Sequence, residues 1–251
     1  MDWVSHWRGR SDRAAAGTAV RALSTGAELR ALRELFDLAW PSPSTQITQN
    51  FGTALIHSGA VLTGVYEDDQ LVAGAIAIVS NQAGKVGLHS HMAATHPDFR
   101  GRGFGALVKY EQAAIAAAQG IKTITWTFDP LVLRNAKLNV LNLGVTIRKF
   151  VPDFYGQMDD EINANDLTDR LWCEWQLDQP RALTAPHQPL PISDDLIRVP
   201  IVKDIGAIKN VDPKQARELR LDMRKALSNA LDETREIKGI SPADEYLIGN
   251  T

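Results

Sequence analysis

The most informative part of this sequence runs from residue 95 to residue 106 and reads Thr95-His96-Pro97-Asp98-Phe99-Arg100-Gly101-Arg102-Gly103-Phe104-Gly105-Ala106. A strand-like segment precedes it, and a segment with the spacing of an amphipathic helix follows it. Glycines at alternate positions let main-chain N–H groups converge on one point, and the N-terminus of the helix adds free N–H groups and partial positive charge. Arg100 and Arg102 can add charge-assisted contacts. The segment therefore predicts a phosphate-binding turn, with a tight turn carrying solvated arginines as the alternative.

The glycine spacing also bears on which phosphate would bind. Gly101-x-Gly103-x-x-Ala106 fits a dinucleotide-binding fingerprint, and Asp129 ends the next strand, where an acid that holds a ribose would lie. In that fingerprint the strand leads directly into the first glycine, whereas residues 97–100 intervene here. No Lys-Ser or Lys-Thr follows the glycines, which argues against a Walker-type loop. A nucleotide-binding oxidoreductase therefore stays open as one alternative.

The segments around the turn predict an α/β fold. Three apolar or β-branched runs between residues 61 and 95, separated by polar turns, predict an antiparallel meander. Other elements are expected from periodicity and turn residues: a strand at 20–23, two helices between about 29 and 59, a helix at 103–119, a strand at 123–128, a helix at 133–143 and a strand at 145–151. This order indicates a mixed sheet.

Three regions are expected along the chain. Residues 1–17 lack strong periodicity and predict a flexible leader, residues 18–156 form the core, and residues 157–251 form a C-terminal extension packed on that core. In the extension, residues 171–177 predict a strand, the proline-rich residues 179–200 an extended connection, and Asp212-Pro213 the start of a helix with an apolar stripe. The extension can cover an acceptor site, mediate a homodimer or shield a sheet edge.

Composition excludes several classes of protein. The 251 residues are 44% hydrophobic and 23% charged with a net charge of −3, which argues against a general nucleic-acid or anionic-membrane binder. The single cysteine, Cys173, excludes an intrachain disulfide and a multi-cysteine metal site. No apolar run is long enough to span a bilayer and no secretory signal is evident, so a cytoplasmic protein is expected.

Residues 93–105 resemble the acyl-CoA-binding signature of the GNAT acyltransferase superfamily, and the order of elements is similar over about residues 18–156. Two further blocks resemble a little-characterised branch of predicted GNAT proteins: Trp126-Thr127-Phe128-Asp129-Pro130 with Arg134-Asn135-Ala136, and Asp169-Arg170-Leu171-Trp172 with Glu174-Trp175. The resemblance implies a mixed, mostly antiparallel central sheet flanked by helices, with a C-terminal strand and helix extension. It also implies acetyl-CoA or another acyl-CoA as co-substrate.

The resemblance further implies which residues would hold acyl-CoA. These are Ala93, Ala94, Thr95, Arg100, Gly101, Arg102, Gly103, Gly105, Ala106, Asn135 and Asn139. The main chain of residues 93–95 would pair with the pantetheine arm like an added strand, and the amides of residues 101–106 would hold the diphosphate. Asn135 or Asn139 would lie near the arm, although a solvated helix face is an equal alternative.

Acyl transfer needs an unprotonated amine, polarisation of the thioester and a proton for the leaving thiolate. The candidates for this chemistry are His89, Ser90, His91 and Asp129. Alternation along a strand sends His89 and His91 to one face and Ser90 to the other. The alternatives are structural roles for the histidines and an Asp-Pro turn at Asp129. A metal site is not expected, because no third ligand is evident near the histidines. Val140 stands where many members of the superfamily have a tyrosine that protonates the thiolate.

Two functions follow from the resemblance. The first is an N-acyltransferase that uses acetyl-CoA by default, or succinyl-CoA, to modify a small amine or amino acid. Succinyl-CoA is considered because proteins resembling this branch include amino-acid N-succinyltransferases, and Arg134 or Arg100 could face a donor carboxylate. The second is a non-catalytic module that binds CoA esters in a regulatory or scaffolding role, an alternative favoured by Val140 and by the extension.

Overall fold

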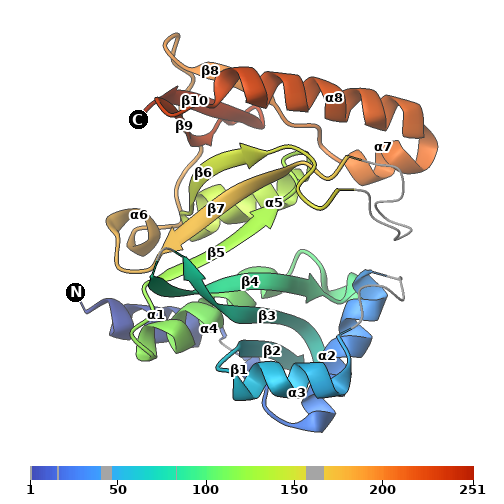
Figure 1. Ribbon diagram of the computed structural model, residues 1–251, viewed down its shortest axis with the longest axis vertical. Coiled ribbons are helices and arrows are strands. Elements are labelled where there is room, and N and C mark those ends of the chain that lie inside the picture. The colour runs from blue at the N-terminus through green and yellow to red at the C-terminus, as the bar shows by residue number, and fades with distance from the viewer. Residues whose placement is uncertain (1, 16, 41–46, 83, 157–166) are drawn as a thin grey trace. The chain divides into compact units, whose positions relative to one another are not determined.

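The structure, a computed structural model, describes residues 2–15, 17–40, 47–82, 84–156 and 167–251 (Figure 1). Within the described residues its contacts form two compact units, one that ends at residue 125 and one that begins at residue 126. The division falls between residues 125 and 126, inside the strand Thr123–Phe128.

The first unit contains the predicted meander. Its elements are α1 (Trp3–Ala14), β1 (Ala19–Ala22), α2 (Gly26–Ala39), α3 (Gln49–His57), β2 (Val61–Glu67), β3 (Gln70–Gln82), β4 (Lys85–Thr95), η2 (Pro97–Phe99), α4 (Phe104–Ala118) and the start of β5 (Thr123–Phe128). The strands lie in the order β1-β2-β3-β4-β5, and every pair is antiparallel except β4 with β5. The prediction of a mixed, mostly antiparallel sheet is therefore confirmed.

Helices cover both faces of this sheet. On one face α2 packs Leu29, Leu32, Leu35 and Phe36 against β2 and β3. On the other face α4 packs Phe104, Leu107 and Val108 against the same strands. Because α4 starts directly after the glycine turn, burial of its apolar face holds that turn at the end of β4.

Helix α1 corrects the prediction of a flexible leader at residues 1–17. Its first turn is capped by Asp2, whose carboxylate accepts from the amides of Val4 and Ser5. Trp7 is fully buried and stacks on Tyr110 of α4, with ring centroids 6.4 Å apart. The segment is ordered because α4 offers it a packing surface, which local periodicity does not reveal.

Strand β4 contains a bulge at His91. Met92 lies opposite Ile76 and Ser90 lies opposite Ala77, so His91 is the extra residue in the ladder. The bulge changes the alternation that follows, because Ser90 contacts Lys109 and Gln112 of α4 whereas Met92 and Ala94 pack on the side of α2. It therefore alters the course of the strand just before the glycine turn.

The second unit contains the rest of β5 and the C-terminal elements. These are α5 (Leu133–Lys137), η3 (Leu138–Leu143), β6 (Thr146–Val151), β7 (Arg170–Gln176), α6 (Pro180–Leu183), β8 (Ile197–Pro200), α7 (Ile205–Val211), α8 (Pro213–Ala230), β9 (Arg235–Ile240) and β10 (Glu245–Asn250). Strands β6 and β7 pair antiparallel, and β8, β10 and β9 form a separate antiparallel sheet. The helix predicted at 133–143 is one α-turn followed by a π-helical turn that Gly144 closes in the left-handed region.

Parts of the C-terminal prediction need correction. The proline-rich residues 179–200 do not form only a connection, because they include α6 and β8. The β9–β10 hairpin was not predicted. The apolar stripe of α8 is confirmed as a packing face, since Ala216, Met223, Leu227 and Ala230 are buried. None of the helices in the described part of the chain has the length and apolar composition needed to cross a membrane.

Candidate functional site

The glycine turn joins β4 to α4 in the first unit. Gly101 and Gly103 both lie in the left-handed region, with φ of 81° and 85°. A Cβ atom added to either would meet nothing within 4 Å, so backbone conformation and not crowding requires glycine there. The turn consequently has open space beside its main chain.

Main-chain donors are concentrated at the start of α4. Gly103 is the N-cap, and its carbonyl already accepts from the amides of Ala106 and Leu107, at 3.0 and 3.1 Å. The amides of Phe104 and Gly105 belong to the first turn, where no intrahelical acceptor exists. Of the predicted diphosphate donors, the Ala106 amide is therefore already engaged, while those at the beginning of the helix are oriented for an anion.

The two arginines of the turn differ in their surroundings. Arg102 Nη2 lies 2.6 Å from Glu67 Oε2, at the end of β2. The Arg102 guanidinium also lies over the rings of Phe104 and Phe99, 4.9 and 5.3 Å from their centroids. Arg100 is exposed and forms no ion pair with any residue that the structure describes. The sequence did not predict Glu67 as part of this site.

The last residues of β4 have a free edge. Strand β4 pairs with β5 only at Leu88 and His89, so its edge from Ser90 to Thr95 has no further strand pairing within the described parts of the first unit. On its other edge, Ala93, Ala94 and Thr95 pair with β3. An extended ligand could therefore add to the free edge through main-chain hydrogen bonds.

The two histidine rings of β4 lie close to each other. Their ring centroids lie 6.5 Å apart, and His89 Nδ1 lies 3.2 Å from Thr125 Oγ1. The Thr125 hydroxyl also lies within donating distance of the Leu88 carbonyl, at 3.4 Å, an arrangement that suits donation from His89 Nδ1 to Thr125.

Both histidine pKa values are lowered. Burial, with smaller contributions from the charges of His91 and Lys109, lowers the pKa of His89 to about 4. The pKa of His91 is also lowered, because protein atoms displace water from part of its ring although the side chain is exposed. Both imidazoles are thus neutral near pH 7, and His91 is the more accessible of the two.

Ser90 points to the opposite face, into the interior. Its Oγ accepts from Lys109 Nζ at 2.5 Å and donates to Gln112 Oε1 at 3.0 Å. All three side chains are buried. Lys109 and Gln112 were not singled out in the sequence, because a helical period assigns them no special role. These buried hydrogen bonds indicate a structural role for Ser90.

Asp129 belongs to the second unit and is occupied there. Its Oδ2 lies 2.8 Å from Arg220 Nη1 of α8, and its Oδ1 accepts from the Leu131 amide at 2.9 Å. Next to it, the Tyr246 hydroxyl of β10 donates to the Pro130 carbonyl at 2.9 Å. Asp129 and its neighbour Pro130 therefore contact α8 and β10, which belong to the region predicted as a C-terminal extension.

The predicted asparagines also lie in the second unit. Asn139 is buried and its Oδ1 accepts from Trp126 Nε1 at 3.2 Å, whereas Asn135 is half-buried. Val140 is buried, so that position offers an aliphatic side chain and no proton donor. The Asn139 amide thus has a packing role beside the indole.

Metal-ligating clusters are not found in the described part of the chain, where no group of three or more His, Cys, Asp and Glu side chains could hold an ion.

The antiparallel pairing of β2, β3 and β4 differs from the parallel βαβ units of a dinucleotide fold. The oxidoreductase alternative therefore loses its structural basis.

Comparison with known proteins relates the first part of the chain to one protein family. Residues 5–128 match the family model described as the acetyltransferase (GNAT) domain. An N-acetyltransferase from Staphylococcus aureus Mu50 aligns with a TM-score of 0.51 at 14% identity, over 64% of this chain and 99% of that one. The ribosomal-protein-S18-alanine N-acetyltransferase from Escherichia coli aligns with a TM-score of 0.49 at 12% identity, over 64% of this chain and 95% of that one. No curated protein matches the sequence at a significant level.

Proposed function

Because this chain belongs to the GNAT acyltransferase superfamily through its residues 5–128, we propose that it transfers an acyl group from acyl-CoA to the amino group of a small molecule, such as an amino acid. Acetyl-CoA is the proposed donor, and succinyl-CoA is the second donor to test. The observation that carries the proposal is the free edge of β4, followed after the short helix η2 by a turn with two left-handed glycines.

The chain's residues would bind the co-substrate in two parts. The main chain of residues 93–95 would pair with the pantetheine arm, as edge strands pair with extended peptides. The amides at the start of α4, with Gly101 and Gly103 leaving the main chain uncovered, would hold the diphosphate. This fit rests on main-chain groups and is therefore compatible with more than one acyl group.

His91 is the proposed general base. It is exposed on β4 and its lowered pKa keeps the ring neutral near pH 7, so it can accept a proton from the acceptor ammonium group, directly or through a water. The amine nitrogen then attacks the thioester carbonyl, a C–N bond forms, the C–S bond breaks and the CoA thiolate leaves. Because Val140 offers no proton, water or another group must protonate the thiolate.

His89 is the second candidate base, with a weaker case. It bonds to Thr125, and a pKa of about 4 makes it a poor proton acceptor. Substituting His91→Gln is therefore expected to lower kcat by about 100-fold, within the usual range for a general base, while His89→Gln has a smaller effect. CoA affinity should stay unchanged in both.

The test is release of free thiol from acetyl-CoA and from succinyl-CoA in the presence of a panel of amines and amino acids, with CoA binding measured separately by calorimetry. Turnover with either donor, reduced in His91→Gln, would support the proposal. Arg134→Gln serves to separate the donors, because it should weaken use of succinyl-CoA alone if Arg134 meets the donor carboxylate.

Val140 also favours a second candidate function, a non-catalytic module that binds CoA esters and regulates or scaffolds another process. CoA binding without turnover against the whole panel would support this module. Absence of CoA binding would contradict both candidates.

A further inference from the structure

The pairing of β4 with β5 places a buried hydroxyl beside one of the histidines. In the described part of the chain these strands pair at two positions, Leu88 with Ile124 and His89 with Thr125. Thr125 Oγ1 lies 3.2 Å from His89 Nδ1 and 3.4 Å from the Leu88 carbonyl oxygen. Thr125 is buried and His89 is half-buried, so little water competes for this hydroxyl. The hydroxyl can therefore direct the His89 ring.

The neighbours of Thr125 Oγ1 favour one direction of hydrogen bonding. A carbonyl oxygen can only accept, so the hydroxyl hydrogen is best placed toward Leu88. The lone pairs of Oγ1 then face His89 Nδ1, which suits the neutral tautomer with its hydrogen on Nδ1. In that tautomer Nε2 has the free lone pair. Thr125 is thus positioned to select between the two neutral forms of His89.

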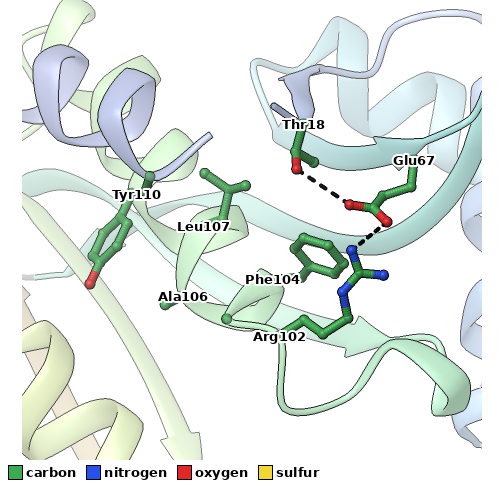
Figure 2. A pocket seen from close by; sticks show the side chains of 9 residues that line it. Thr18, Glu67, Arg102, Phe104, Ala106, Leu107 and Tyr110 are labelled. Carbon is green, nitrogen blue, oxygen red and sulfur yellow. Dashed lines mark hydrogen bonds and ion pairs between the residues drawn. The ribbon is translucent and has the colours of Figure 1, made fainter. Parts of the chain in front are cut away.

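His89 lies on the face of the sheet that α2 covers, because its ladder partner Ile78 packs against the apolar cluster around α2. The opposite face belongs to α4, whose Leu107, labelled in Figure 2, packs with residues of β2 and β3. Lys109 of the same helix bonds to Ser90 on that side. The orientation of the His89 ring is therefore determined on the α2 side of the sheet.

His91 is the proposed base and lies close to His89. The ring centroids are 6.5 Å apart, with the planes inclined by 38°. His91 is exposed, and it forms no hydrogen bond with any residue in the described ranges. This separation leaves room for one water molecule between facing ring nitrogens, and such waters commonly join polar groups that are beyond direct reach. The orientation of His91 then depends on whether His89 presents a lone pair or an N–H.

We propose that Thr125 is a positioning residue for acyl transfer: by keeping the hydrogen of His89 on Nδ1, it leaves His89 Nε2 as the acceptor that orients His91 through a water molecule. The proposal rests on the function proposed above, in which His91 is the general base. The N–H of His91 donates to the water and the water donates to His89 Nε2, so the other nitrogen of His91 keeps its lone pair for the acceptor amine. The base is then oriented by a third group, as general bases in active sites commonly are.

Proton transfer leaves His89 neutral in this arrangement. The acceptor ammonium group gives one proton to the free nitrogen of His91, and that proton passes to solvent after the product leaves. Burial, with smaller contributions from the charges of His91 and Lys109, lowers the pKa of His89 to about 4, so the proton does not pass on to His89 near pH 7. His89 and Thr125 therefore act through His91 and touch no reacting atom.

The first test is the tautomer of His89 in the isotope-labelled full chain, measured by long-range proton–nitrogen NMR correlations and assigned with His89→Asn. The wild-type ring should carry its hydrogen on Nδ1. Thr125→Val keeps the branched shape but removes the hydroxyl, so the hydrogen should move to Nε2, whereas Thr125→Ser should keep the wild-type form. Thr123→Val, two residues earlier on the same side of β5, is the matched control and should change nothing.

The second test is steady-state kinetics of the same variants. Thr125→Val should lower kcat about tenfold, the equivalent of one neutral hydrogen bond, with KM and the Kd of CoA close to those of the wild type. Thr125→Ser should restore most of kcat, because the effect follows the hydroxyl and not the packing of the side chain. Thr125→Ala replaces Thr125→Val if the valine variant does not fold.

The outcomes separate this proposal from the function it rests on. A wild-type His89 with its hydrogen on Nε2 would overturn the proposal without any assay of turnover. An unchanged kcat in a folded variant whose tautomer has moved would also overturn it, while the acyltransferase function would stand. If no pair of donor and acceptor gives turnover, the proposed function fails and takes the catalytic role of Thr125 with it, whatever the tautomer of His89.

Discussion

Lys109 Nζ lies 2.5 Å from Ser90 Oγ, and both side chains are buried between α4 and β4. A buried ammonium group requires acceptors, because its desolvation is otherwise uncompensated. Ser90 is therefore better explained as a structural acceptor for Lys109 than as a residue of the reaction, although it lies next to both histidines of β4.

Substituting Ser90→Ala should lower the free energy of unfolding by about 1–3 kcal/mol, because Lys109 loses a buried acceptor. CoA affinity and turnover should remain close to those of the wild type. Urea denaturation checks the first expectation, with Ser80→Ala, at a half-buried position of β3, as the matched control. Loss of turnover in Ser90→Ala without loss of stability would instead indicate a catalytic role for Ser90.

Trp7→Ala should lower the free energy of unfolding by about 3–5 kcal/mol, the usual range for truncating a fully buried aromatic side chain. The stack on Tyr110 would be lost and α1 would pack loosely. Trp3→Ala changes a half-buried tryptophan of the same helix and should cost less. Equal effects of the two substitutions in chemical denaturation would mean that α1 does not pack through Trp7.

Asp129→Asn and Arg220→Gln should destabilise the protein by similar amounts, because each removes one charge of the same largely buried ion pair. The double variant should be no less stable than either single variant. A thermodynamic cycle measured by urea denaturation gives the coupling. Additive losses would contradict a direct interaction, and loss of turnover in Asp129→Asn alone would favour a catalytic role.

Acidification should destabilise the protein through His89. Its pKa is about 4 in the folded chain and about 6.5 when exposed, so between these values the unfolded state binds more protons. Stability should therefore fall as pH decreases from about 6.5 toward 4, and His91, whose pKa is also lowered, acts in the same direction.

The measurement is the urea midpoint at several pH values in this window. His89→Asn should flatten the dependence, while His57→Asn, at the exposed end of α3, controls for removal of a histidine. An unchanged slope in His89→Asn would show that His89 is protonated as readily in the folded chain as in the unfolded one.

The sequence pattern alone predicted the elements whose signals, such as turn residues and periodic apolar positions, lie within the element itself. The three strands of the meander have β-branched runs bounded by turns, and α4 begins at Phe104, directly after the glycine that caps it. The strand predicted at residues 123–128 has those same bounds in the structure. Local turn chemistry and periodicity were sufficient for these elements.

The features that pattern missed depend on contacts distant in sequence. Helix α1 is held by Glu111, whose carboxylate accepts from Arg8 and Ser11, and only the folded chain brings these residues together. The same holds for Glu67 beside Arg102 and for Asp129 beside Arg220. The β9–β10 hairpin is different, since the β-favouring residues 246–248 after a turn carried a local signal that was not used.

The packing of α1 has a practical consequence for any shortened form of the protein. A chain that began at residue 18 would keep the whole meander and the glycine turn, yet it would strip the cover from Tyr110 and Glu111. Glu111 would lose the hydrogen bonds that it accepts from Arg8 and Ser11 in the folded chain. Such a truncated protein would expose the ring of Tyr110 that Trp7 covers and would tend to associate through α4.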